Sequence, residues 1–222
     1  MHNYGLNGYI LQIDIQSYYP SMCHDVVKKK FERYLYINDL NSVCDILDAQ
    51  CTSEIGYLPG SQMVQIAGIS ALDDLDHFCK ERLHLKHYIR YMDDILILHD
   101  NKDILTDCLK EIENRLSGIG FNLNRNKTHI TKLNNGFIYL GFKYRITSTG
   151  KIIMTINSAN VKHERKKLFR LVKLAKQGKI SKNKVDECFK SWCAHASKGN
   201  SYKLINRMKR YYINLWRCVN ES

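Results

Sequence analysis

Apolar and polar residues alternate over the segment GYILQIDI, residues 8–15. From position 11 onward the apolar side chains share one face, whereas Gln12 and Asp14 share the other. A period of two residues is typical of a β-strand that buries one face. Pro20 ends the segment, so we expect a half-buried strand that presents Asp14 on its polar face.

A second strand pattern lacks alternation, because every position of ILIL, residues 95–98, is apolar. Such a strand is expected to be covered on both faces. Asp93 and Asp94 stand between it and the strand-like HYIRYM that begins at His87. Neighbouring ionised carboxylates repel each other and are costly beside a dry core. We therefore predict a β-hairpin that carries a pair of carboxylates at its turn.

Apolar residues three to four positions apart predict helices in much of the rest of the chain. The predicted helices start near His24, run over 61–83 and 102–117, and recur in the basic segment from about Ser158. Beside the apolar stripe of the long helix stand three acidic residues that we interpret as solvated surface charge: Asp73, Asp74 and Asp76.

The segment 41–60, which contains CTSEIGYLPG, is predicted to be a loop closed by Pro59 and Gly60. Further strands are predicted in FNLNRNKTHI, GFIYLGFKYRI and KIIMTI, which together cover 121–130, 136–146 and 151–156. The resulting order, β-α-α-ββ-α-β-ββ followed by helices, indicates an α+β domain with a helical tail.

Charge is distributed unevenly along the chain, whose net formal charge is +12. Residues 151–222 hold 18 Lys and Arg against four acidic residues, whereas residues 1–150 hold 16 against 18. This difference favours a phosphate-binding module attached to a nearly neutral core with an acidic site. A solvated basic surface without a ligand is the plainer interpretation.

Cysteine spacing and hydropathy exclude several protein classes. None of the eight cysteines forms a C-x-x-C pair, which argues against a zinc or redox centre. No apolar run approaches the length of a membrane span, and MHNYGLNGYI does not resemble a signal peptide. We therefore expect a protein of the reducing cytoplasm with no membrane segment.

A cation would explain the clustered carboxylates. If the two strands are neighbours in one sheet, Asp14, Asp93 and Asp94 converge on one point. Turns favour aspartate in any case, so the hairpin pair alone is weak evidence. Mg²⁺ prefers oxygen ligands and keeps open positions for substrate phosphates. Two such ions can activate an attacking hydroxyl and stabilise a departing pyrophosphate.

The tetrapeptide YMDD, residues 91–94, resembles the metal-binding hairpin of reverse transcriptases. Five further segments resemble motifs of that family in the same order: LQIDIQSYYPSM, GYLPGSQMVQIAG, LNRNKTHI, FIYLGFKYRI and SWCAHASKGNSYKL. The resemblance implies an α+β palm, a ferredoxin-like antiparallel sheet with helices on one face. A basic, mostly helical thumb would follow, and we place the boundary between 1–157 and 158–222.

The same resemblance implies roles for individual residues. Two Mg²⁺ ions, with Mn²⁺ as a possible substitute, would be held by Asp14, Ile15, Asp93 and Asp94. Lys127 would be the catalytic lysine near the departing pyrophosphate. Nucleotide binding would fall to Tyr19, Pro59, Gly60 and Gln65, and the primer grip to Leu140 and Gly141. Without the resemblance, Tyr19 could be a core aromatic, and Lys127 reads equally as a surface lysine.

Two other groups of residues receive structural interpretations. His87 and Arg90 flank the hairpin and are taken as structural. Tyr211, Tyr212 and Trp216 stand beside basic residues and could stack on bases, but their helical spacing favours the core face of a helix.

The function that the resemblance implies is RNA-directed DNA synthesis from an RNA template, a DNA or RNA primer and dNTPs. The family normally carries a fingers region before the first catalytic strand, whereas Asp14 lies only 14 residues from the start. We therefore expect a truncated core, or one that takes its fingers from an accessory protein or second chain. Gln65 favours the diversity-generating retroelement or antiviral defence types of bacterial reverse transcriptase.

Two other functions remain open from the sequence. An inactive remnant of such an enzyme would bind RNA or protein without synthesis. A cyclase or another nucleotidyltransferase on a similar palm would also use paired acids, although a small-molecule enzyme needs no extended basic surface.

Overall fold

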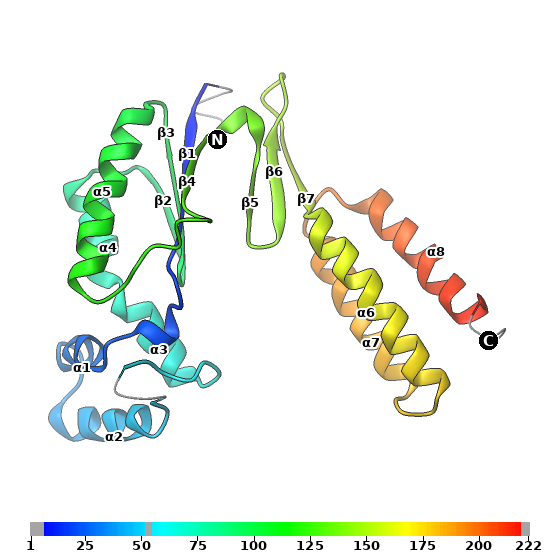
Figure 1. Cartoon of the computed structure of the whole chain (residues 1–222), viewed down its shortest axis with the longest axis horizontal. Coiled ribbons are helices and arrows are strands. Elements are labelled where there is room, and N and C mark those ends of the chain that lie inside the picture. Colours follow the sequence, from blue (N-terminus) through cyan, green and yellow to red (C-terminus); the bar gives the residue numbers. More distant parts are fainter. Residues whose placement is uncertain (1–6, 52–54, 219–222) are drawn as a thin grey trace. The chain divides into compact units, whose positions relative to one another are not determined.

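The computed structural model describes residues 7–51 and 55–218 (Figure 1). Their contacts divide the chain into two compact units, Asn7–Lys132 and, in its described part, Leu133 onward, and each is described by itself. The division falls before the predicted primer-grip hairpin. Within the described ranges, no helix combines the length and hydropathy that a bilayer crossing requires.

The first unit is built on a four-stranded antiparallel sheet in the order β2-β3-β1-β4. The strands are β1 (Tyr9–Asp14), β2 (His87–Tyr91), β3 (Asp94–His99) and β4 (His129–Lys132). Ile95 to Leu98 are all buried, which confirms the prediction of a strand covered on both faces. β1 and β3 are central and adjacent, the condition under which the predicted carboxylates converge.

The helices of this unit include α1 (His24–Glu32), α2 (Ile37–Asp48), α3 (Gln62–Ala71), α4 (Asp73–His77) and α5 (Lys102–Gly118). α4 and α5 lie along one side of the sheet, whereas α1, α2 and α3 lie beyond one end of its strands (Figure 1). α5 follows the predicted pattern most closely, because Leu105, Ile112 and Leu116 are fully buried against the strands. The side chain of Asn101 caps its first turn by accepting from the amides of Asp103 and Ile104.

A predicted loop and a predicted helix differ from the structure. The predicted loop 41–60 is wrong in its first part, because α2 extends to Asp48 and packs Val43 and Leu47 on the core. Residues 52–54 of that segment lie outside the described residues. The predicted helix over 61–83 is broken at Leu72, whose backbone leaves helical geometry, and it ends in a π-helical turn over Phe78–Arg82.

The predicted strand 121–130 is also mostly irregular. Only its last two residues belong to β4, because the carbonyl of Asn124 accepts hydrogen bonds from the amides of Lys127 and Thr128 and forms a turn. The strand prediction failed there because the backbone turns at Asn124 instead of pairing with a neighbouring strand. The side chain of Asn124 donates a hydrogen bond to Asp14.

The second unit contains a three-stranded antiparallel sheet and three helices. Its elements are β5 (Phe137–Tyr139), β6 (Phe142–Ile146), β7 (Ile152–Ile156), α6 (Ser158–Lys176), α7 (Lys182–Ala196) and α8 (Tyr202–Cys218). The helices enclose a core that includes Leu168, Phe189 and Met208. Tyr212 is buried in it, and Tyr211 and Trp216 pack against it, as the core-face interpretation expected.

Glu164 on α6 is a buried carboxylate that this core does not neutralise. It is 4% exposed, and its Oε1 has no hydrogen-bond partner within the described residues. Burial raises the pKa of Glu164, and Lys167 and His163 offset this only in part. Since the folded-state pKa exceeds the ordinary value of 4.5, ionised Glu164 destabilises the unit at neutral pH.

We predict that Glu164→Gln raises the free energy of unfolding at pH 7 by about 1 kcal/mol. The penalty on the wild type is relieved as the pH falls through the raised pKa, so the gain should shrink toward pH 4.5. Urea unfolding at both pH values measures this, with exposed Glu187→Gln as the control. A gain that does not change with pH would show that ionisation of Glu164 is not its cause.

Candidate active site

The register of the sheet brings the predicted carboxylates together. Asp14 on β1 lies directly opposite Asp94 on β3, and Tyr91 on β2 lies opposite Asp94 from the other side. Facing residues of antiparallel strands have Cβ atoms about 4.5–5.5 Å apart. Met92 and Asp93 therefore form a two-residue turn, and Met92 adopts the positive φ of 55° that such turns require at their first position.

Asp14 is held by a short segment that follows α5. Its Oδ1 lies 2.8 Å from the Nζ of Lys127, and its Oδ2 accepts a hydrogen bond of 3.0 Å from the side-chain amide of Asn124. The backbone amide of Asn124 also donates to the backbone carbonyl of Asp14, at 2.8 Å. The Asp14 side chain is 12% exposed, whereas that of Lys127 is 65% exposed and can reach solvent.

Asn124 is a site residue that the sequence did not single out. The only signal was its place within LNRNKTHI, three residues before Lys127. Ile15, predicted as a backbone metal ligand, is buried next to Asp14 and bridges to Leu123. The turn that contains Asn124 therefore contacts the end of β1 at both Asp14 and Ile15.

The cluster carries more negative charge than its neighbours neutralise. Burial raises the pKa of Asp93, and the carboxylate of Asp14 raises it further. Burial also raises the pKa of Asp94, with added contributions from Asp93 and Asp14. The ammonium of Lys127 acts in the opposite direction on both, and its own pKa is raised by the hydrogen bond to Asp14. Three carboxylates thus face one nearby cation, an arrangement that favours binding of further positive charge.

Within residues 7–51 and 55–218, no group of three or more His, Cys, Asp or Glu is assembled to hold a metal ion. Lys127 and Asn124 instead engage both carboxylate oxygens of Asp14. The donor set still fits Mg²⁺ in chemistry, because it consists of carboxylates at neighbouring backbone positions.

Tyr18 and Tyr19 take different positions just after β1. Tyr18 is buried, its ring packs on Phe121, and its hydroxyl donates to the carbonyl of Gly68. Tyr19 turns toward the hairpin, where its hydroxyl lies 3.8 Å from the Sδ of Met92. A Cβ at Gly68 would lie 3.1 Å from the Tyr19 ring, so the absence of a side chain on α3 leaves room for it. Burial, assisted by Asp93, raises the pKa of Tyr19.

Arg90 links the β2–β3 hairpin to the neighbouring helices. Its Nε donates to Asp76 at 2.8 Å, and its other nitrogens donate to the carbonyls of Met92 at 3.2 Å and Ile69 at 3.0 Å. One guanidinium therefore links β2, the turn, α3 and α4, which bears out a structural role for Arg90.

The interpretation as solvated charge was wrong for Asp76, whereas Asp74 is exposed as expected although it forms ion pairs. Asp76 binds Arg90, and Asp74 pairs with Lys30 and Arg33. Their partners lie far away in the sequence, so spacing along the helix could not indicate them. The break at Leu72 separates α3 from the short helix that carries both carboxylates.

The predicted nucleotide-binding residues at the start of α3 lie on the surface. Pro59, Gly60 and Gln65 are all exposed, and Gly60 has a φ of 139°. Ser61 caps the helix by accepting from the amide of Val64 at 3.1 Å. No hydrogen bond among the described residues joins this segment to the aspartates.

The predicted primer-grip residues belong to the second unit. Leu140 and Gly141 form the two-residue turn between β5 and β6, and both have positive φ, 46° and 82°, as a type I′ turn requires. The carbonyl of Gly141 accepts hydrogen bonds from the amide of Asn157, at 3.0 Å, and the side chain of Asn160, at 3.3 Å. The turn is thereby anchored to the start of α6.

Comparison with known proteins agrees with this geometry. A family model described as "Reverse transcriptase (RNA-dependent DNA polymerase)" matches residues 5–144. No curated protein sequence matches the chain.

Solved structures of telomerase share the fold. A telomerase from Candida albicans, in complex with a TWJ fragment of telomeric RNA, is 14% identical with a TM-score of 0.53, over 99% of this chain and 46% of that chain. Apo telomerase from Candida tropicalis is 16% identical with a TM-score of 0.53, over 66% of this chain and 32% of that chain. The chain thus spans less than half of the length of these proteins, 46% and 32% respectively.

Proposed function

Because this chain belongs to the reverse transcriptase family, we propose that it is the catalytic core of an RNA-directed DNA polymerase. It would transfer a nucleotide from a dNTP to the 3′-hydroxyl of a DNA or RNA primer on an RNA template. The observation that carries the proposal is the pairing of Asp14 with Asp94 beside Asp93, in a cluster with uncompensated negative charge.

Asp14, Asp93 and Asp94, with the carbonyl of Ile15, would hold two Mg²⁺ ions, for which Mn²⁺ could substitute. When bound, these cations would supply the charge that activates the primer hydroxyl and stabilises the leaving pyrophosphate. The rigid strands keep the carboxylates at neighbouring positions, and Arg90 holds the turn against α3 and α4.

Lys127 contributes a mobile positive charge at the same place. Its exposed Nζ lies on Asp14 and could turn to a phosphate oxygen of the departing pyrophosphate. Tyr19, placed beside the hairpin turn, would exclude nucleotides with a ribose 2′-hydroxyl. Pro59, Gly60 and Gln65 would contact the incoming nucleotide. Leu140 and Gly141 would hold the primer strand.

The helical unit would act as the thumb, with its basic side chains on the backbone of the template–primer duplex. The bacterial subtype, whether retroelement or antiviral defence, rests on Gln65 and stays a prediction. An accessory protein or second chain as the source of a fingers region also stays a prediction.

The test is primer extension on poly(rA)·oligo(dT) with Mg²⁺, compared with the same reaction in EDTA. We expect extension that requires both the RNA template and the cation. RNA binding without extension at any protein concentration would contradict the proposal and favour an inactive binding module. Products formed from ATP or GTP alone would instead indicate a cyclase or another small-molecule nucleotidyltransferase.

A further inference from the structure

The helical unit has an excess of cations that its own carboxylates do not balance. Residues 133–218 contain 20 Lys and Arg and three acidic residues. Glu164 is buried, Asp186 accepts from the hydroxyl of Tyr212 at 2.6 Å, and Glu187 lies 3.8 Å from Lys184. The cations on the facing sides of α6 and α8 therefore lack an internal counter-ion.

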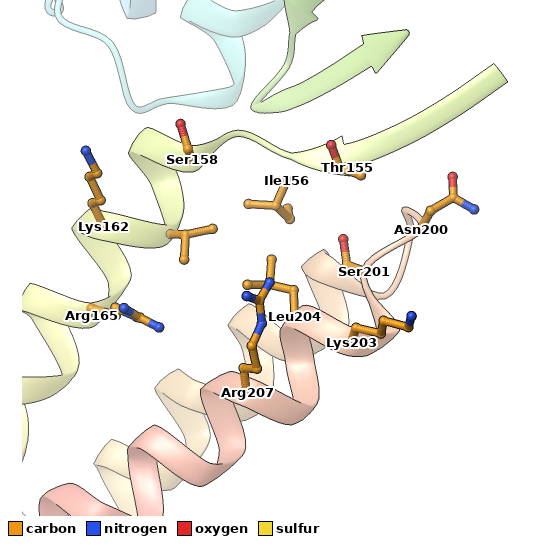
Figure 2. A pocket seen from close by; sticks show the side chains of 11 residues that line it. Thr155, Ile156, Ser158, Lys162, Arg165, Asn200, Ser201, Lys203, Leu204 and Arg207 are labelled. Atoms are coloured by element: carbon orange, nitrogen blue, oxygen red, sulfur yellow. The ribbon is translucent and has the colours of Figure 1, made fainter. Parts of the chain in front are cut away.

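Four of these cations line one cavity of about 440 Å³ between the first turns of α6 and α8 (Figure 2). They are Lys162 and Arg165 from α6, and Lys203 and Arg207 from α8. The guanidinium groups of Arg165 and Arg207 both extend into the space between the helices (Figure 2). No ion pair within the described residues joins any of the four to a carboxylate. The guanidinium of Arg165 also lies over the ring of Tyr211 on α8, 5.3 Å from its centroid, which holds it between the two helices.

The floor of the cavity supplies a second, independent feature. Ser201 lines it, is 2% exposed, and has a buried hydroxyl without a hydrogen-bond partner in the described part of the chain. Its carbonyl accepts from the amide of Ile205 at 2.9 Å, so Ser201 stands at the start of α8. The positive end of a helix favours an anion there, and buried polar groups normally have a partner.

Beside the cavity, a second hollow continues along α8. It is lined by Lys203, Asn206, Arg207 and Arg210, so two cations are shared between the two hollows. The apolar side chains of Ile156 and Leu204 line the first cavity and lower the local dielectric, which strengthens charge-assisted hydrogen bonds. The continuation suits a chain of phosphates better than a single free ion.

We propose that this cavity binds a backbone phosphate of a nucleic-acid strand, with Arg165 and Arg207 on its non-bridging oxygens and the Ser201 hydroxyl as a further donor. The inference rests on the proposed function, which provides an RNA template and a primer but does not say where the helical unit holds them. It assigns a defined site in place of a diffuse basic surface.

The test compares two double variants of the full chain. Arg165→Gln/Arg207→Gln removes the cavity cations, and Arg170→Gln/Arg217→Gln removes the same charge from the same helices outside the cavity. Affinity for a 12-nucleotide single-stranded RNA is measured in EDTA without dNTPs, so that catalysis has no part in the result. A DNA strand of the same sequence shows whether template or primer chemistry is preferred.

We expect the cavity variant to bind about tenfold more weakly than the control variant at ~0.1 M salt, with a salt slope smaller by about 0.7. Ser201→Ala should lose about threefold in affinity with an unchanged melting temperature, because its hydroxyl has no partner to lose. Equal losses in both double variants would overturn the proposal and indicate nonspecific attraction. A protein inactive in primer extension that still shows the cavity-dependent binding would refute the polymerase and leave this site standing.

Discussion

Asp93→Ala is expected to reduce deoxynucleotide incorporation by about 10³-fold or more, with nearly unchanged RNA affinity. The substitution removes the carboxylate at the hairpin turn, which lies beside Asp94 and acts electrostatically with Asp14. Groups placed directly on charge that develops during reaction have effects of this size, whereas RNA affinity depends on the basic helical unit. Extension on an RNA template and RNA binding in EDTA measure the two quantities separately.

Asp107→Ala is the matched control for Asp93→Ala. Asp107 lies on α5, is 74% exposed, and forms only a surface ion pair with Lys110. Extension by this variant should equal that of the wild type. Equal extension by Asp93→Ala would refute the assignment of the hairpin carboxylates to metal binding. A parallel loss of RNA binding would show that the substitution had disrupted the fold instead.

Gly56→Ala is expected to destabilise the first unit by about 3 kcal/mol or more. Gly56 has a φ of 95°, and a Cβ there would lie 2.3 Å from the carbonyl oxygen of Pro20. The backbone cannot move away, because its amide donates to Met22 at 3.0 Å and its carbonyl accepts from His24 at 3.0 Å. The left-handed conformation and the contact with rigid backbone therefore both oppose alanine.

Gly60→Ala separates these two contributions. Gly60 also has a positive φ, 139°, but a Cβ there would meet nothing within 4 Å. Gly60→Ala should lower the free energy of unfolding by about 1 kcal/mol, which is the backbone contribution alone. Urea unfolding gives both values, and equal losses would show that the contact with Pro20 is unimportant. Gly56→Ala should also weaken activity, because the adjacent amide of Tyr57 holds the carbonyl of Tyr19 at 3.0 Å.

The elements with strong local periodicity were predictable from the sequence. The apolar run 95–98 and the stripe of α5 specify which faces are buried, and the structure has them so. The alternation up to Asp14 correctly predicted the buried Leu11 and Ile13, but Ile10 and Asp14 on the opposite face are buried as well. The segment 41–48 also had helical spacing, but the Gly and Pro of the following CTSEIGYLPG drew the prediction toward a loop. The break at Leu72 left no local signal, because the residues on both sides favour helix.

The family resemblance and the expected pairing of the two strands allowed the aspartates of the site to be predicted, but not their hydrogen-bond partners. The sequence indicated that Asp14 and the hairpin pair converge if their strands are neighbours, and the strand order meets that condition. It could not indicate that Asn124 binds Asp14, or that Asp76 binds Arg90, because such pairs depend on tertiary packing. The cavity between α6 and α8 escaped prediction for the same reason, since neither helix alone defines it.

Lys127, which pairs with Asp14, places a positive charge where the proposed Mg²⁺ ions would bind. Without this lysine, repulsion among the three carboxylates would oppose the pairing of β1 with β3. Folding would then depend on a bound cation. A tethered ammonium relieves part of that repulsion and, being largely in solvent, can withdraw without disturbing the strands. If the proposed metal site is correct, this unit would fold without Mg²⁺ and bind the cation afterwards.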